Sequence, residues 1–174
     1  MDMPTTLLIG LGNPILGDDG VGWRVVEALQ SEGLPPQVEA VCLAAGGLRL
    51  MEAMLGYAQV VIVDAFAAPG RPPGQVFSAP MSALPIPDGG HLTSSHDTSL
   101  PRALEMARHL GLPTPCRVAV VGIVVHPTLE FSEMLSPPVA AAIPKAKVMV
   151  RRYIWFPPKS CAVSHSSGNS TANN

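Results

Sequence analysis

Apolar residues along the chain fall into two patterns, short continuous runs and longer stretches with helical spacing. Continuous runs predict buried strands at residues 6–10, 38–43, 60–65 and 117–125, since each run has strand length and is almost wholly apolar. A shorter apolar run at residues 74–79 predicts one more strand, within a surface excursion rich in Pro, Gly and Ser.

Between these runs, apolar residues recur every three or four positions, which predicts amphipathic helices. The third helix has candidate caps at residues 97–99 and a stop signal at Gly111. Ser136 is a candidate cap for the last helix, and Pro144 predicts a kink within it. The predicted helices span residues 20–31, 48–55, about 100–110 and 136–154.

Apolar strands that alternate with helices predict an α/β fold. Such strands are typical of a mainly parallel sheet, here central and twisted, with helices on both faces. The sequence predicts one such domain over residues 1–156. Residues 157–174 hold too few apolar residues to pack, so we expect a disordered tail there.

Charge and composition narrow the classes of function. The net charge of -2 and the absence of a basic patch argue against a nucleic-acid partner. No apolar run approaches the ~20 residues that cross a bilayer, and the first residues lack a basic leader, so we expect a cytoplasmic protein with no membrane partner. Three cysteines without a CxxC pair predict reduced thiols.

Candidate chemistry gathers where the predicted strands end. The loop "GLGNPILGDDGVG" at residues 10–22 follows the first strand and carries Asp18 and Asp19. Asp64 ends the third predicted strand, and His96 lies in the loop before the third helix. In an open parallel sheet, ligands bind at the carboxyl ends of the strands. Carboxylates and an imidazole at that edge suit a divalent cation with open coordination positions.

Each of these residues also has a structural interpretation. Asp18 and Asp19 could cap the first helix, Asp64 could bond a loop amide, and His96 could be a surface residue of a capping turn. The functional hypothesis therefore depends on the combination of the three segments.

Two other ligand chemistries compete with a cation site. A dinucleotide fold needs a third glycine close behind Gly12 and an acid after the second strand, and this chain departs from both requirements. A phospho-accepting, receiver-like signalling domain also uses an acid pair and a strand-end Asp. In that domain the pair directly follows the strand, and a Lys follows a later strand. Here "VVHPT" holds no Lys, so the receiver-like domain stays as an alternative.

The same residues resemble a known family, the maturation endopeptidases of nickel-iron hydrogenases. Residues 10–22 match the family's signature G-x-G-N-x-x-x-x-D-[DE]-x-x-G, with Asn13 and Asp18 as signature neighbours of Asp19. The segment "VVIVDA" resembles the family's strand that ends in Asp, and "SSHDTSL" resembles its loop with a metal-site His.

The resemblance implies an endopeptidase that removes the C-terminal extension of the nickel-loaded large-subunit precursor. The metal would then be nickel supplied by the precursor, contacted by Asp19, Asp64 and His96, which are also the candidate catalytic residues. A carboxylate or a metal-bound water would supply the nucleophile or base. A non-catalytic module that binds nickel or the precursor needs the same ligands and remains an alternative.

Overall fold

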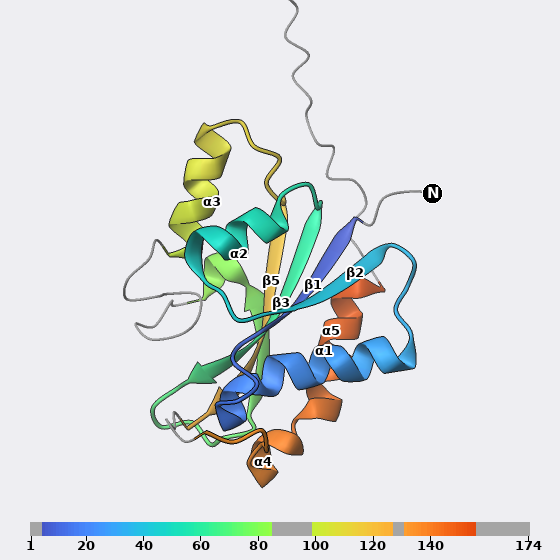
Figure 1. Cartoon of the computed structure of the whole chain (residues 1–174), viewed down its shortest axis with the longest axis vertical. Coiled ribbons are helices and arrows are strands. Elements are labelled where there is room, and N and C mark those ends of the chain that lie inside the picture. Colours follow the sequence, from blue (N-terminus) through green and yellow to red (C-terminus); the bar gives the residue numbers. More distant parts are fainter. Residues whose placement is uncertain (1–4, 85–98, 127–130, 156–174) are drawn as a thin grey trace, which may run out of the picture.

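The computed structural model describes residues 5–84, 99–126 and 131–155. His96 and the predicted tail from residue 157 lie outside the described residues. Within the described residues, the chain forms one sheet flanked by helices (Figure 1). The strands are β1 (Thr6–Leu11), β2 (Val38–Leu43), β3 (Gln59–Ala67), β4 (Val76–Pro80) and β5 (Arg117–Val125). The helices are η1 (Gly17–Gly20), α1 (Val21–Glu32), α2 (Gly47–Met54), η2 (Met81–Ala83), α3 (Leu100–His109), α4 (Pro137–Ala140) and α5 (Ile143–Ile154).

The five strands lie in the order β2-β1-β3-β5-β4. Neighbouring strands are parallel, except that the edge strand β4 runs antiparallel to β5. The predicted mainly parallel sheet is therefore confirmed, and the short run near residue 76 forms its antiparallel edge.

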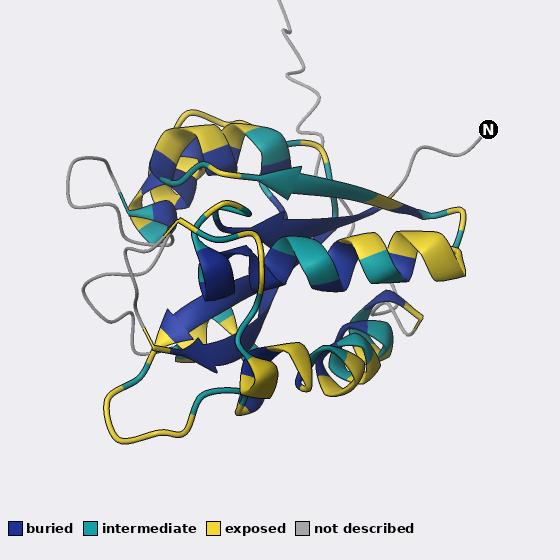
Figure 2. Cartoon of the chain, turned by 60° about the horizontal axis from the view of Figure 1, so that its bottom comes forward, coloured by how far each residue is buried: buried dark blue, intermediate teal, exposed yellow. Residues whose placement is uncertain are grey.

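Helices cover both faces of the sheet, as the apolar strands predict. One face packs against α1, α4 and α5, with Leu8, Val61 and Val121 in its core. The other face packs against α2 and α3, with Ile9 and Ile62 in its core. Figure 2 shows the buried strands between helices whose outer surfaces are exposed. A three-layer arrangement follows, with two hydrophobic cores separated by the sheet.

The structure corrects the predicted end of the third strand. β3 continues past Asp64 to Ala67, because β5 keeps pairing with it as far as Ala67 opposite Val125. β1 pairs with β3 only as far as Gly10 opposite Val63. Asp64 therefore lies inside β3, one residue beyond the last pair with β1.

The single kinked helix predicted over residues 136–154 is wrong. The segment forms two helices, α4 and α5, separated by Ala141 and Ala142. Pro144 lies in the first turn of α5, where its missing N–H is not needed. The proline therefore begins a helix at this position and does not bend one.

The expectation of three reduced thiols is also wrong. Cys116 is disulfide-bonded, whereas Cys42 is free. Burial raises the pKa of the Cys42 thiol to about 11, with a further contribution from the charge of Glu27. Sequence spacing carries no information on which cysteines meet in space, and this explains the error.

In the part of the chain that the structure describes, no helix combines the length and the apolar character needed to cross a bilayer.

Candidate functional site

The candidate site lies at the carboxyl edge of the sheet, between β1 and β3. α1 follows β1 and packs on one face, whereas α3, the helix that follows β3 and β4, packs on the other. Neighbouring strands whose connections go to opposite faces leave a crevice between their carboxyl ends, where α/β proteins bind ligands. The loop after β1 and the C-terminal part of β3 both lie at this edge, and η1 contacts β3.

The glycine loop brings Asp19 close against the end of β1. Gly12 has a φ of 127°, and a Cβ atom there would lie 2.0 Å from the backbone oxygen of Asp19. Only glycine allows both this backbone conformation and this close approach. The N–H of Asn13 donates to Oδ2 of Asp19 at 2.7 Å. The backbone of the loop thus orients the half-buried Asp19 carboxylate.

Asn13 also shapes the turn that leads to this carboxylate. Its side-chain Oδ1 accepts a bond from the N–H of Ile15 at 3.2 Å, which forms an Asx-type turn. The signature asparagine therefore has a structural role in this chain. Its side chain shapes the loop, and its backbone N–H contacts Asp19.

Asp18 has a different role from its neighbour. Its Oδ1 accepts a bond from the N–H of Ser136 at 2.6 Å, and its Oδ2 accepts one from the Ser136 hydroxyl at 2.7 Å. The N-cap of α1 is Gly20, without a side-chain cap bond, so the alternative interpretation in which Asp18 caps this helix does not hold. Asp18 instead links η1 to the residue before α4.

Ser136 is a residue whose role the sequence did not reveal. It stands at the N-cap of α4, as predicted, but α4 has no side-chain cap bond. Its hydroxyl contacts a carboxylate 118 positions away in the sequence. A helix-cap pattern is local, so it could not indicate this partner.

Asp64 is fully buried within β3. It alternates with Ile62 and Phe66, which pack with α2 and α3, so its side chain lies on that face of the sheet. The N–H of Ala65 donates to its Oδ1 at 2.9 Å. Burial of a carboxylate is costly unless polar groups compensate it, and such a residue at a sheet edge is a candidate functional group.

A glycine and an aromatic ring border Asp64. Gly122 is its partner in β5, and Phe77 of β4 lies opposite Gly122 on the other side. A Cβ atom at Gly122 would lie 2.2 Å from the Phe77 ring. The ring of Phe77 also meets that of Phe66 edge to face, with the centroids 5.2 Å apart. The missing side chain at Gly122 therefore makes room for an aromatic cover next to Asp64.

The structure brings two of the three predicted metal-contacting residues to one edge of the sheet. Asp19 reaches it from η1 and Asp64 from β3, whereas His96 lies outside the described residues. Among the residues that the structure describes, no three His, Cys, Asp or Glu side chains are grouped closely enough to hold a metal ion. The described residues therefore offer carboxylates at this edge but no complete metal cage.

Comparison with known proteins gives a consistent result. The family model described as hydrogenase maturation protease matches residues 23–152, a segment that includes Asp64 and His96 and begins after Asp19. The hydrogenase 2 maturation protease of Escherichia coli is 30% identical over 141 residues, which cover 80% of this chain and 84% of that protein. The hydrogenase expression/formation protein HupD of Thiocapsa roseopersicina is 28% identical over 152 residues, 87% of this chain and 68% of that protein.

Solved structures support the same assignment. The hydrogenase maturating endopeptidase HybD from Escherichia coli superposes with a TM-score of 0.68 at 28% identity, covering 84% of this chain and 90% of that one. The [NiFe] hydrogenase maturation protease HybD from Thermococcus kodakarensis gives a TM-score of 0.61 at 23% identity, over 86% and 98% of the two chains, and shows the shared fold. The chain therefore belongs to the hydrogenase maturation protease family and is an endopeptidase of that class.

Proposed function

We propose that this endopeptidase removes the C-terminal extension of the large-subunit precursor of a nickel-iron hydrogenase after nickel has been inserted. In this proposal Asp19, Asp64 and His96 contact the nickel, which arrives with the precursor as part of the substrate. The protein then needs no resident metal of its own.

One observation carries the proposal. Two carboxylates that lie 45 positions apart in the sequence reach the same edge of the sheet, where the pairing of β1 with β3 ends. Backbone N–H groups hold one oxygen of each carboxylate, at 2.7 Å for Asp19 and 2.9 Å for Asp64. Side chains fixed in this way suit a site that must position a substrate group without rearrangement.

The chemistry follows from the charge of these groups. Two carboxylates at one edge favour a cation over the phosphate that a glycine loop otherwise binds. With the nickel held there, the chain's own carboxylates lie beside the neighbouring peptide bond, where one of them can take up a proton from an attacking water. The role of the chain is therefore to bind the metal-bearing segment, orient the scissile bond and accept a proton.

The test uses purified precursor in nickel-loaded and nickel-free form. Asp19→Asn, Asp64→Asn and His96→Ala are compared with Glu27→Gln, which neutralises an exposed carboxylate of α1 that pairs with Arg24. We expect wild type and Glu27→Gln to cleave the loaded precursor. The three site variants should be slower by at least ~100-fold, as for loss of an acid–base group. The cleaved extension is measured by mass spectrometry.

Two results would contradict the proposal. Equal cleavage of loaded and nickel-free precursor would show that the metal is not what the site recognises. Unchanged cleavage by Asp19→Asn or Asp64→Asn, with the variants folded by circular dichroism, would show that these carboxylates do not act in the reaction.

A further inference from the structure

Three large apolar side chains are exposed on the loop that carries Asp19 and on the segment bonded to it. They are Ile15, Phe131 and Met134, exposed by 46%, 83% and 81%. We call these three residues the apolar patch, and residues 131–136 the strap. None of the residues assigned above to the site belongs to the patch.

The strap is bound firmly to the Asp19 loop. Leu16 and Ser132 form a parallel bridge, in which the N–H of Ser132 donates to the Ile15 carbonyl at 2.9 Å and the N–H of Gly17 donates to the Ser132 carbonyl at 2.6 Å. Ile15 and Phe131 directly precede the two bridged residues, so they are neighbours across the parallel bridge.

Further contacts fix the rest of the strap. Arg24 of α1 donates to the carbonyl of Glu133 at 3.3 Å, and Asp18 accepts both bonds from Ser136. The Ser132 hydroxyl and the backbone of Met134 are bonded within the strap. The apolar side chains thus stand on a backbone that is held at both of its ends.

Packing within the protein does not account for the exposed positions of these side chains. Leu135 of the same strap packs against the core that α1 and α5 cover, so the segment already has its internal anchor. Single exposed apolar residues are ordinary, but here three stand on two segments that are hydrogen-bonded to each other, which favours a contact surface. Phe and Met are also residue types that are enriched in binding surfaces.

We propose that the apolar patch is the docking surface for the polypeptide chain of the substrate, next to the bond that is cut. This inference rests on the proposed function, since it assigns a second contact of the same precursor. Ile15 lies four residues before Asp19 on one loop, so a chain that presents its metal to Asp19 passes beside the patch. The patch then binds apolar side chains of the precursor while the carboxylates contact its metal.

The size of the patch favours a transient polypeptide over a second copy of this chain. A stable interface buries ~800 Å² on each partner. Even a fully exposed aromatic side chain buries only ~150–250 Å². Two of the three patch residues are not aromatic, and Ile15 is already about half covered, so the patch supplies less than that area. A protease must release its product, and an anchor of a few side chains suits such a short-lived complex.

The test compares Phe131→Asp and Met134→Asp with Leu110→Asp. Leu110 is a matched control because it is 73% exposed and lies at the opposite edge of the sheet, between α3 and β5. Cleavage kinetics with the nickel-loaded precursor give kcat and KM, and binding of the same precursor is measured by surface plasmon resonance. Light scattering gives the molecular mass of each variant.

We expect KM and Kd to rise by about tenfold or more in the two patch variants, corresponding to ~1.4 kcal/mol, with kcat nearly unchanged. Leu110→Asp should behave as wild type. Unchanged KM and Kd in both patch variants would overturn the inference while leaving the proposed function intact. Equal losses in the control would overturn it too, as would a dimeric wild type that the patch variants make monomeric.

Failure of the proposed function is a separate result. If wild type binds the precursor without cutting it, the binding data still test the patch. If wild type neither binds nor cuts it, both proposals are wrong.

Discussion

Gly22 stands where α1 comes closest to the sheet. A Cβ atom at this position would lie 2.4 Å from the carbonyl oxygens of both Leu11 and Val63. Both contacts are to backbone, at the carboxyl end of β1 and where its pairing with β3 ends, so no side chain can rotate away. The absence of a side chain at Gly22 thus lets η1 and α1 hold Asp19 at the edge that Asp64 also reaches.

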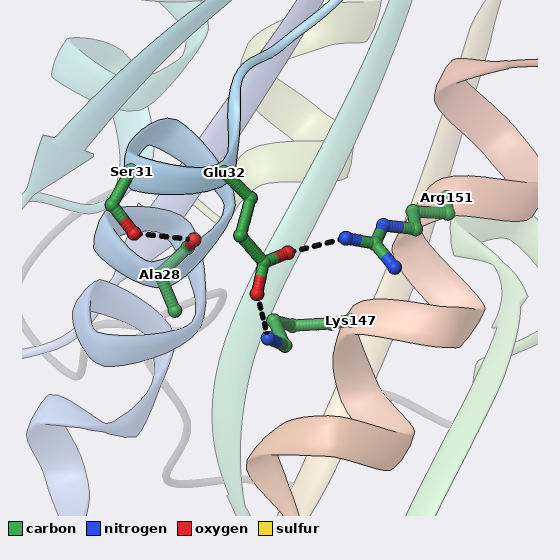
Figure 3. A network of polar contacts seen from close by, with 5 residues as sticks. All are labelled: Ala28, Ser31, Glu32, Lys147 and Arg151. Carbon is green, nitrogen blue, oxygen red and sulfur yellow. Dashed lines mark hydrogen bonds and ion pairs between the residues drawn. The ribbon is translucent and has the colours of Figure 1, made fainter.

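Gly22→Ala tests this close contact, because the contact and helix propensity predict opposite changes in the free energy of unfolding. Propensity alone predicts that Ala in a helix stabilises by up to about 1 kcal/mol relative to Gly. The close contact with the two carbonyl oxygens predicts the opposite effect. We expect the free energy of unfolding to fall by roughly 1–3 kcal/mol, as at other overpacked sites. Urea unfolding measures the change, with Ser31→Ala as the control on the exposed side of the same helix (Figure 3). A stabilised Gly22→Ala would contradict the close approach.

Ser136→Ala tests the link between η1 and the strap. The change removes the hydroxyl that donates to Oδ2 of Asp18 and keeps the backbone N–H that donates to Oδ1. Because the Asp18 carboxylate is nine-tenths buried, water replaces this bond poorly, and we expect a loss of ~1–3 kcal/mol in the free energy of unfolding. Ser132→Ala is the control, since its hydroxyl is exposed and bonds within the strap. Equal effects of the two changes would argue against a special role for the buried pair.

At the level of elements, α1 and α5 lie side by side on one face of the sheet and are joined at their exposed surfaces. Glu32, the last residue of α1, pairs with Lys147 and Arg151 of α5 (Figure 3). The hydrogen bond from Lys147 is the main cause of a lowered pKa at Glu32, and the charges of both cations add to it. The carboxylate is therefore more stable in its ionised form in the folded protein than in the unfolded chain.

The lowered pKa of Glu32 predicts that the stability of the protein depends on pH. A carboxyl whose folded pKa lies below 4.5 stabilises the fold above that pH and loses the effect as the pH falls through the folded pKa. Glu32→Gln should therefore be less stable than wild type at neutral pH, and the difference should vanish in acid. Urea unfolding between pH 3 and 7 measures this, with Glu52→Gln on α2 as control. High salt should reduce the difference as well, because the pair is exposed. A difference that persists in acid would contradict the ion-pair explanation.

For the whole molecule, the order of elements could be predicted from the apolar pattern. Strands buried on both faces must be apolar throughout, and helices on a sheet need an apolar stripe. Each therefore leaves a pattern of apolar residues that can be recognised in the sequence alone. The position of Asp19 near the sheet edge follows as well, since a glycine loop after a strand must end close to that strand. The resemblance of residues 10–22 pointed to the family that the comparisons then showed.

Features that depend on distant partners could not be predicted in this way. The length of β3 beyond Asp64 is set by its pairing with β5, which begins more than fifty residues later. The role of Asp18 is set by Ser136, and the position of Phe131 beside Ile15 is set by the bridge between Leu16 and Ser132.

The sequence by itself thus determined the layered fold and a carboxylate edge, because local periodicity and glycine geometry encode them. Only the tertiary structure decided which aspartate is structural, where Asp64 lies within its strand and which surface stays uncovered. These depend on contacts between residues far apart in the chain, and such contacts leave no local pattern in the sequence.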